Sequence, residues 1–292
     1  MVSPITRNKI IQLLEEKSGI QQHIKSVKEF SGGSINRACR IETETGNYFV
    51  KVNEAKKFPG MFEAEAKGLK LLKNAECISV PEVLQVFDDD AEQFILMEYI
   101  FQGTPEKDFH FQFGKSLAYL HKNTTELFGL DHDNYIGSLR QSNKLHKHHS
   151  DFFINERIMP QLKMAIDSGA AEKNISAGFD RLFKVMKDII PDEAPALLHG
   201  DLWSGNYTCG KNNKAWIFDP AVYYGHREAD IAMTKLFGGF GSDFYAGYDE
   251  EFPLAKGWES RVDIFNLYPL LVHVNLFGGH YIYDVERILE RY

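Results

Sequence analysis

The sequence predicts a bilobal α+β fold, in which a small antiparallel-sheet N-lobe, residues 1–100, precedes a larger, mainly helical C-lobe, residues 101–292. Three observations predict it. Short alternating segments separated by turn residues fill the first hundred residues. From Glu106 onward, apolar residues recur at helical spacing. Two acidic residues of the second part, Asp201 and Asp219, follow short apolar runs, where loops on a rigid scaffold carry chemistry.

The N-lobe is expected to contain two helices and a sheet. Residues 1–19 lack an apolar signal-peptide core and show the pattern of an amphipathic helix. A second helix should run from Pro59-Gly60 to about Lys73. The predicted strands are Ala38–Ile41, Tyr48–Val52, Val83–Phe87 and Phe94–Tyr99, with turn residues Glu44–Asn47 joining the first two and a solvated acidic tip, Asp88–Asp90, joining the last two.

The C-lobe is expected to be helical except around its acidic residues. Helices are predicted at Phe109–His121, Phe152–Ser168, Ala177–Ile189 and in the aromatic-rich end of the chain. Strand-like pieces at Leu197-Leu198 and Trp216–Phe218 bracket the residues between them. The late apolar segment 262–277 is interrupted by polar residues and by Pro269, so it does not predict a membrane span.

The composition is that of an ordinary soluble globular protein, with 43% hydrophobic and 25% charged residues. A net charge of -8 without a basic stripe argues against nucleic-acid binding. Cys39, Cys77 and Cys209 are far apart and lack metal-site spacing, which predicts reduced thiols in a cytoplasmic protein. We expect no membrane association, and the sequence does not determine the oligomeric state.

The most informative stretch is His199-Gly200-Asp201-Leu202-Trp203-Ser204-Gly205-Asn206, followed by Asp219. An H-x-D-x-x-x-x-N spacing with a second Asp is typical of phosphoryl transfer from a nucleotide to a hydroxyl group. Asp201 would be the catalytic base that accepts the hydroxyl proton. Asn206 and Asp219 would bind Mg²⁺ against the phosphates, because this ion prefers oxygen ligands.

Lys51 is the candidate phosphate-binding cation, since it lies within the apolar segment 49–52, where a charge needs a partner or a ligand. An edge-strand lysine that faces solvent is the alternative. On the following helix, Glu65 lies on the apolar face and Glu63 on the exposed one. That apolar face consists of Phe62, Ala66, Leu69 and Leu72. We therefore expect Glu65 to hold Lys51 toward the α- and β-phosphates.

Two further segments are candidates for nucleotide binding. Gly32-Gly33-Ser34 lies between strand segments, and glycine lets backbone N–H groups approach phosphates, although two glycines in a hairpin also form an ordinary turn. The strand through Met97 passes into the helical lobe. The Glu98 carbonyl and the Ile100 N–H group would bind the adenine edge, with Met97 against the ring; a plain buried strand is the alternative.

Two features have open alternatives. Trp203 is either a core plug or an exposed indole that stacks on a sugar face. The segment His146–His149 has no carboxylate or thiol pattern for a metal site, so we expect a flexible basic surface loop. A lid near an anionic substrate is the alternative for this segment.

These motifs resemble the signature of the fructosamine kinase (ketosamine 3-kinase) family, in the aminoglycoside and choline kinase-like branch of the protein-kinase-like fold. The resemblance covers essentially the whole chain and is strongest between residues 198 and 240. It is carried by Leu198–Asn206, Phe218–Ala221, Tyr224–Glu228, Asp230, Phe237–Phe240, Gly32–Ile35, Lys51 and Met61–Glu65.

The resemblance implies ATP-dependent phosphorylation of the C3 hydroxyl of a ketosamine, either a small molecule or a glycated lysine on a protein. The phosphorylated adduct falls apart and frees the amine, which is a repair reaction. The matched positions are Asp201 as base, Asn206 and Asp219 as Mg²⁺ ligands, Lys51 with Glu65 on the phosphates, Asp230 as a brace of the catalytic loop, and His273 and Asn275 near the sugar pocket.

The chain departs from protein kinases in having Asp219-Pro220-Ala221 in place of Asp-Phe-Gly, so regulation by a flip of that segment is not expected. Ser34 stands where some relatives carry a cysteine, which excludes a redox switch there. Two alternatives to a ketosamine kinase stay open: a kinase for another hydroxyl metabolite, such as an aminoglycoside or choline, and a non-catalytic nucleotide-binding scaffold. Against the scaffold stand four intact residues, Lys51, Asp201, Asn206 and Asp219.

Overall fold

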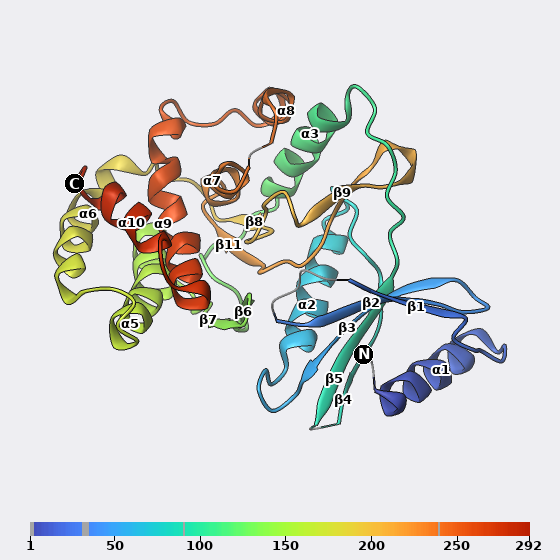
Figure 1. The fold of residues 1–292 in the computed structure, drawn as a ribbon. Coiled ribbons are helices and arrows are strands. Elements are labelled where there is room, and N and C mark those ends of the chain that lie inside the picture. Colours follow the sequence, from blue (N-terminus) through green and yellow to red (C-terminus); the bar gives the residue numbers. More distant parts are fainter. Residues whose placement is uncertain (1–2, 31–34, 90, 239) are drawn as a thin grey trace.

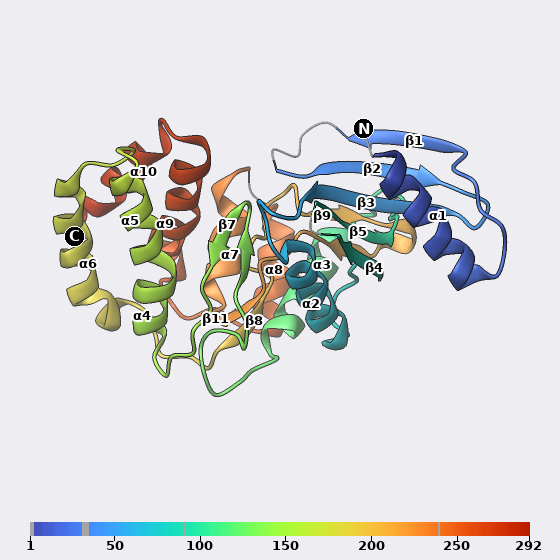
Figure 2. The same cartoon turned by 90° about the horizontal axis from the view of Figure 1, so that it is seen from below.

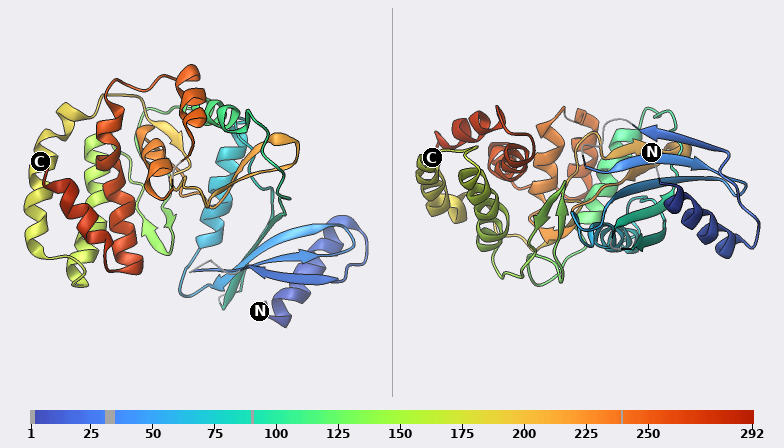
Figure 3. Two further views of the ribbon diagram at one scale, coloured as in Figure 1. Left: turned by 45° about the horizontal axis from the view of Figure 1, so that its top comes forward. Right: turned by 60° about the horizontal axis from the view of Figure 1, so that its bottom comes forward.

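The structure is a computed structural model that describes residues 3–30, 35–89, 91–238 and 240–292. A five-stranded antiparallel sheet comes first, and a mainly helical part with three short strand pairs follows (Figure 1). The helix Pro4–Ser18 lies beside the sheet and the C-terminus lies at the far end of the helical part, and both views in Figure 3 show the sheet to one side of the C-terminal helices. This confirms the bilobal α+β fold.

The sheet has the strand order β1-β2-β3-β5-β4 and one helix on each face. Its strands are β1 (Ser26–Phe30), β2 (Arg37–Glu42), β3 (Asn47–Glu54), β4 (Val83–Asp88) and β5 (Glu92–Glu98). On β3, Val50 and Val52 pack with α1 (Pro4–Ser18), whereas Lys51 between them points toward α2 (Met61–Asn74). Alternation along one strand therefore places an ammonium group on the face opposite to α1.

Most of the elements expected before residue 100 are present. The turn residues 44–46 join β2 to β3, and α2 follows Gly60 and buries Phe62, Leu69 and Leu72. Asp90 of the acidic tip lies outside the described residues. β1 has no predicted range, because most of its side chains are exposed and do not alternate. Because the sheet ends at Glu98, we propose residue 100 as the lobe boundary.

The second part is helical where the sequence predicts it, with four short strand elements more than expected. The helices are α3 (Phe109–His121), α4 (His149–Phe152), α5 (Met159–Asp167), α6 (Ser176–Ile189), α7 (Glu228–Leu236), α8 (Ser242–Glu251), α9 (Trp258–Phe277) and α10 (Tyr281–Leu289). The strands are β6 (Asn134–Ile136), β7 (Leu139–Gln141), β8 (Ala196–Leu198), β9 (Tyr207–Cys209), β10 (Ala215–Ile217) and β11 (Tyr223–Gly225). A π-helical turn at Phe153–Ile158 joins α4 to α5, so the predicted helix begins earlier than Phe152.

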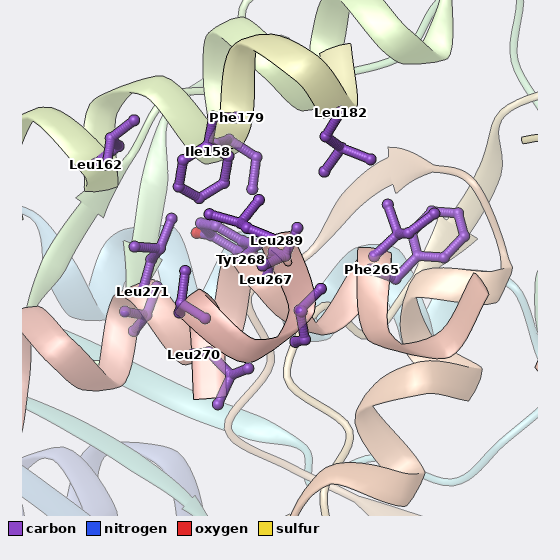
Figure 4. Close-up of a cluster of buried hydrophobic side chains, with 14 of the residues drawn as sticks. Ile158, Leu162, Phe179, Leu182, Phe265, Leu267, Tyr268, Leu270, Leu271 and Leu289 are labelled. Atoms are coloured by element: carbon purple, nitrogen blue, oxygen red, sulfur yellow. The ribbon is translucent and has the colours of Figure 1, made fainter. Parts of the chain in front are cut away.

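Helix α9 forms the centre of the helical core (Figure 4). Its residues Leu267 and Leu271 are fully buried, and they pack with Leu162 of α5, Leu182 of α6 and Leu289 of α10. Burial on most sides explains why this segment is so apolar. Within the described residues, no helix is long and apolar enough to cross a lipid bilayer.

The expectation of a surface loop at His146–His149 holds for Lys147 and His148, which are exposed, but it is wrong for His149. His149 is buried at the start of α4, and its ring stacks on Phe153 at a centroid distance of 5.5 Å. His226 lies 5.1 Å from the same ring, and His146 binds Glu156 at 2.9 Å. A neutral imidazole packs among apolar rings as an aromatic group, and the clustering of histidines in the sequence does not reveal this.

This buried imidazole predicts acid-sensitive stability. Neither ring nitrogen of His149 has a hydrogen-bond partner in the described chain, and burial, with a smaller effect of His226, lowers its pKa well below the usual range. Above about pH 6.5, His149 is neutral in both the folded and the unfolded protein, so its ionisation does not change the free energy of unfolding. Because its pKa is depressed in the folded state, only the unfolded state gains a proton as the pH falls below that value, and stability is lost. We expect the melting temperature of His149→Phe to fall less between pH 7.5 and pH 5.5 than that of the wild type. Each kcal/mol of unfolding free energy that the variant retains corresponds to roughly 2–4 °C.

The exposed neighbour His148 provides the control. His148→Phe should keep the acid dependence of the wild type in the same melting experiment. Equal acid sensitivity of the wild type and His149→Phe would contradict the assignment.

Candidate active site

Two loops of the helical part meet and carry the acidic residues of the motif. Asp201 lies between β8 and β9, and Asp219 lies between β10 and β11. The two loops are bonded to each other through their backbones: the Ala221 N–H donates to the His199 carbonyl at 2.9 Å, and the Phe218 N–H donates to the Asn206 carbonyl at 3.1 Å. Residues that are distant in sequence therefore share one rigid frame.

Two positions in these loops have a left-handed backbone. Gly200 has φ 82°, and a Cβ atom there would lie 2.1 Å from the Ala221 carbonyl oxygen, so that only glycine fits. Asp219 has φ 58°, which is uncommon for a residue with a side chain but tolerated by Asp. Non-glycine residues in this region tend to occur at functional sites.

Asn206 orients Asp201. Its side-chain nitrogen donates to the Asp201 carbonyl at 2.8 Å and to carboxylate Oδ2 at 3.1 Å. Since the nitrogen is used in this way, the side-chain oxygen of Asn206 is the atom that can bind a cation. Burial and the negative charge of Asp219 raise the pKa of the Asp201 carboxyl well above its usual range, against the hydrogen bond from Asn206.

Lys51 connects the sheet to the second loop. Its ammonium nitrogen lies 2.8 Å from Glu65 Oε1 on α2 and 2.5 Å from Asp219 Oδ1. The Lys51 and Glu65 side chains are 7% and 11% exposed, whereas that of Asp219 is 45% exposed. Burial alone would lower the pKa of Lys51, but Asp219 and Glu65 outweigh it, and the net pKa is raised. The structure thus contains the expected Lys51–Glu65 ion pair, and Glu63 is exposed.

The oxygen atoms of these loops fit Mg²⁺ by their chemistry. Asn206 offers an amide oxygen, and Asp219 offers a carboxylate that is partly open to solvent. Magnesium usually takes one or two such protein ligands and completes its shell with water and phosphate oxygens. A divalent cation here would also offset the repulsion between the carboxylates of Asp201 and Asp219.

Asp230 braces the loop of Asp201, as the resemblance implies. Its carboxylate accepts the backbone N–H groups of His199 at 2.7 Å and Gly200 at 2.9 Å. His121 Nε2 lies 3.2 Å from Asp230 Oδ2, and the Tyr248 hydroxyl lies 2.8 Å from His121 Nδ1. Because an ionised carboxylate only accepts hydrogen bonds, His121 donates from Nε2 to Asp230, while its Nδ1 shares a hydrogen bond with the Tyr248 hydroxyl. The catalytic loop is therefore held by a buried chain of polar groups.

The sequence analysis missed His121 and Tyr248. His121 lies four residues after Leu117 on the apolar face of α3, and a polar group at such a position needs a buried partner. The partner is Asp230, 109 residues further along the chain, which helical periodicity does not reveal.

The nucleotide-binding candidates of the sheet are described only in part. Gly32-Gly33-Ser34 lies outside the described residues. Met97 is buried with the residues between the sheet and α2, Glu98 is exposed, and Ile100 is half-buried where the chain leaves β5. The adenine-binding roles of these three residues stay predictions.

Trp203 is 37% exposed, so it does not fill the core. Its ring lies against Gly205: a Cβ atom at Gly205 would be 2.2 Å from ring atom Cη2. The glycine therefore lets the indole rest against the loop that begins at Asp201. The core-plug alternative is wrong, and contact of the indole with a sugar stays a prediction.

The two remaining candidates lie on α9. His273 Nδ1 donates to the Pro269 carbonyl at 2.7 Å, and Pro269 lines a small cavity together with Asp201. The Asn275 side-chain nitrogen donates to the Gln161 carbonyl and side-chain oxygen at 2.9 Å and 2.8 Å, which ties α9 to α5. His273 thus lies one helical turn from the cavity next to Asp201, whereas the amide nitrogen of Asn275 is used between helices.

A sequence model of the fructosamine kinase family matches residues 6–292, nearly the whole chain. The chain belongs to the fructosamine kinase family. It is 39% identical to a probable ketoamine kinase of Vibrio parahaemolyticus over 97% of both chains. It is 36% identical to the chloroplastic protein-ribulosamine 3-kinase of Arabidopsis thaliana, over 94% of this chain and 84% of that protein.

Solved structures agree with this family and with the kinase-like fold. A candidate fructosamine-3-kinase from Haemophilus somnus matches with a TM-score of 0.88 at 30% identity, over 97% of this chain and 96% of that chain. Spectinomycin phosphotransferase, solved with ADP and spectinomycin, matches with a TM-score of 0.57 at 16% identity, over 99% of this chain and 95% of that chain. At that identity the likeness shows the fold alone.

Gly225–Glu228, one of the segments that carry the resemblance, forms ion pairs with other parts of the protein. Arg227 Nε donates to Glu193 at 2.7 Å, and Arg261 Nη2 lies 2.6 Å from Glu228. These ion pairs anchor the start of α7, the helix that carries Asp230. The contacts of this segment therefore support the loop of Asp201, and they do not indicate which acceptor the protein uses.

The Trp203–Gly205 contact predicts the effect of one added methyl group. Gly205→Ala must displace the indole, because the new Cβ would overlap the ring of Trp203. We expect a changed tryptophan emission spectrum and stronger quenching by acrylamide. Gly241→Ala is the control, since nothing lies within 4 Å of a Cβ atom at that position. Identical spectra for the wild type and Gly205→Ala would disprove the contact.

Proposed function

We propose that the chain is an ATP- and Mg²⁺-dependent kinase that phosphorylates the C3 hydroxyl of a ketosamine and thereby frees glycated amines. The observation that carries the proposal is the meeting of Lys51, Asp201, Asn206 and Asp219 within one hydrogen-bonded frame. Family membership supports the acceptor class, as does the similarity to a ribulosamine 3-kinase. The ADP complex of a fold neighbour supports a nucleotide donor.

In this mechanism each side chain has one task. Lys51, held by Glu65, binds the α- and β-phosphates. Asn206 and Asp219 would hold Mg²⁺, which would supply positive charge to the phosphates when it is bound. Asp201 accepts a hydrogen bond from the acceptor hydroxyl, aims it at the γ-phosphate and takes its proton late in the transfer. The raised pKa of Asp201 suits this task, because a carboxylate at its usual pKa is a weak base.

For the acceptor we propose a site between Trp203 and His273. The exposed indole of Trp203, two residues after Asp201, offers a flat apolar face to a sugar. His273 uses Nδ1 for the Pro269 carbonyl, so Nε2 remains for a hydroxyl or an amine of the ketosamine. Burial lowers the pKa of His273, which keeps the ring neutral near pH 7. Both free ketosamines and glycated lysines on proteins fit a site that is open to solvent on the indole side.

The substitution Asp201→Asn tests the base. It removes the proton acceptor and keeps the size of the side chain, so we expect Mg²⁺-dependent turnover of ATP with a ketosamine to fall by roughly 10²–10⁴-fold. The acceptor is identified with a panel of ribulosamines, erythrulosamines, fructosamines, a glycated protein, aminoglycosides and choline. Retained turnover in the variant would exclude Asp201 as the base, and preference for an aminoglycoside or choline would overturn the ketosamine assignment.

Helix α2 offers a matched pair of variants for the phosphate-binding lysine. Glu65→Gln removes the charge that holds Lys51, and we expect the KM for ATP to rise about tenfold, which corresponds to about 1.4 kcal/mol. Glu63→Gln makes the same chemical change on the exposed face of the helix and should leave kinetics unchanged. If both variants bind and turn over ATP like the wild type, Glu65 does not position Lys51.

A further inference from the structure

The β6–β7 hairpin lies between α9 and α2 and contacts the segment that follows Asp219 (Figures 1 and 2). The Asn134 side-chain nitrogen donates to the Val222 carbonyl at 2.7 Å, and the Gln141 side-chain nitrogen donates to the Ala221 carbonyl at 3.1 Å. Asn134 and Gln141 are 6% and 2% exposed. Two buried amides therefore bind the two carbonyls that come just after a candidate Mg²⁺ ligand.

These amides belong to a longer chain of buried hydrogen bonds. Arg157 Nη2 donates to Asn143 Oδ1 at 2.7 Å, and Asn143 Nδ2 donates to Asn134 Oδ1 at 3.0 Å. Gln141 Nε2 donates to the same Asn134 oxygen at 2.7 Å, and the Tyr268 hydroxyl donates to Gln141 Oε1 at 2.6 Å. Since both amide oxygens of the hairpin are occupied, both amide nitrogens must face the backbone carbonyls.

The cation at the start of this chain fixes its direction. Arg157 is fully buried, and the acceptors of its hydrogen bonds are neutral oxygens, namely the Ser142 and Glu156 carbonyls and the Asn143 amide. None of the described carboxylates forms an ion pair with it. A buried charge polarises the dipoles that solvate it, and cooperative hydrogen bonds become stronger in a low-dielectric interior. The positive ends of the Asn134 and Gln141 amides are thus directed at the segment after Asp219.

The same hairpin also contacts the other side of the site. The Tyr135 hydroxyl donates to the Pro59 carbonyl at 3.0 Å, just ahead of α2, which carries Glu65. At the hairpin turn, a Cβ atom at Gly137 would lie 2.9 Å from Leu276 of α9. One short element therefore touches the two segments that bring Glu65 and Asp219 to Lys51.

We propose that Asn134 and Gln141 are positioning residues that hold the backbone after Asp219 and thereby keep its carboxylate in the geometry that binds Mg²⁺. Asp219 needs such support, because its left-handed backbone is costly. On the other side, the segment is held by the bond from the Ala221 N–H to the His199 carbonyl. The inference rests on the proposed function, in which Asp219 is a Mg²⁺ ligand.

The test is Asn134→Asp, which keeps the shape of the side chain and replaces the donor that faces the Val222 carbonyl by an oxygen. Asn155→Asp is the matched control, since the exposed Asn155 makes the same kind of bond to the Asp151 carbonyl at 2.8 Å. Hydrogen–deuterium exchange of residues 218–222 is followed in the nucleotide-free protein, and the Mg²⁺ concentration for half-maximal turnover is measured with ATP and a ketosamine. Gln141→Glu is measured in the same way, in case Asn134→Asp does not fold.

We expect exchange in residues 218–222 to accelerate in Asn134→Asp, and the Mg²⁺ requirement to rise about tenfold, as a lost buried hydrogen bond implies. The control should match the wild type in both measurements. A folded variant with a lower melting temperature but wild-type exchange and wild-type Mg²⁺ requirement would overturn the inference, because Asn134 would then have a structural role only. Absence of Mg²⁺-dependent turnover in the wild type would instead overturn the proposed function, and the exchange measurement would still decide whether the hairpin holds the segment.

Discussion

The buried ammonium group of Lys51 joins the two halves of this molecule, and much of the site depends on it. It lies on the sheet, yet its partners lie on α2 and on a loop of the helical part. A cation with 7% of its side chain exposed needs both carboxylates, since breaking a buried ion pair by removing one partner typically costs about 3–5 kcal/mol. The lysine therefore specifies where α2 and the second loop lie relative to the sheet.

Buried polar groups of the helical part hold the two loops that carry Asp201 and Asp219. Asp230 accepts two backbone N–H groups of the first loop, and His121 accounts for another of its bonds. Asn134 and Gln141 donate to the second loop. Loops that carry chemistry cannot be held by apolar packing alone, because their backbone groups must be satisfied wherever they are buried. A satisfied polar network holds them in one conformation, which apolar contacts specify less precisely.

Sequence reasoning selected side chains that the structure brings together, but it did not find the residues that support them. The H-x-D-x-x-x-x-N spacing places Asp201 and Asn206 in one loop, where Asn206 does contact Asp201, and helical spacing selects Glu65 over Glu63. The prediction was wrong for His149, because a run of histidines predicts a polar surface whether or not one of the rings is buried. Sequence reasoning also missed β1, whose side chains are mostly exposed, and the short strands β6, β7, β9 and β11, which are only three residues long.

By itself, the sequence determined the order of sheet and helices, the family, and the acidic and basic side chains that are candidates for the site. Periodicity and motif spacing are local properties, and they record which face of an element is buried. The tertiary structure alone decided which distant groups meet: His121 with Asp230, Arg261 with Glu228, and the hairpin amides with the carbonyls after Asp219. Such pairs are set by buried hydrogen bonds between segments far apart in the chain, and no repeat in the sequence encodes them.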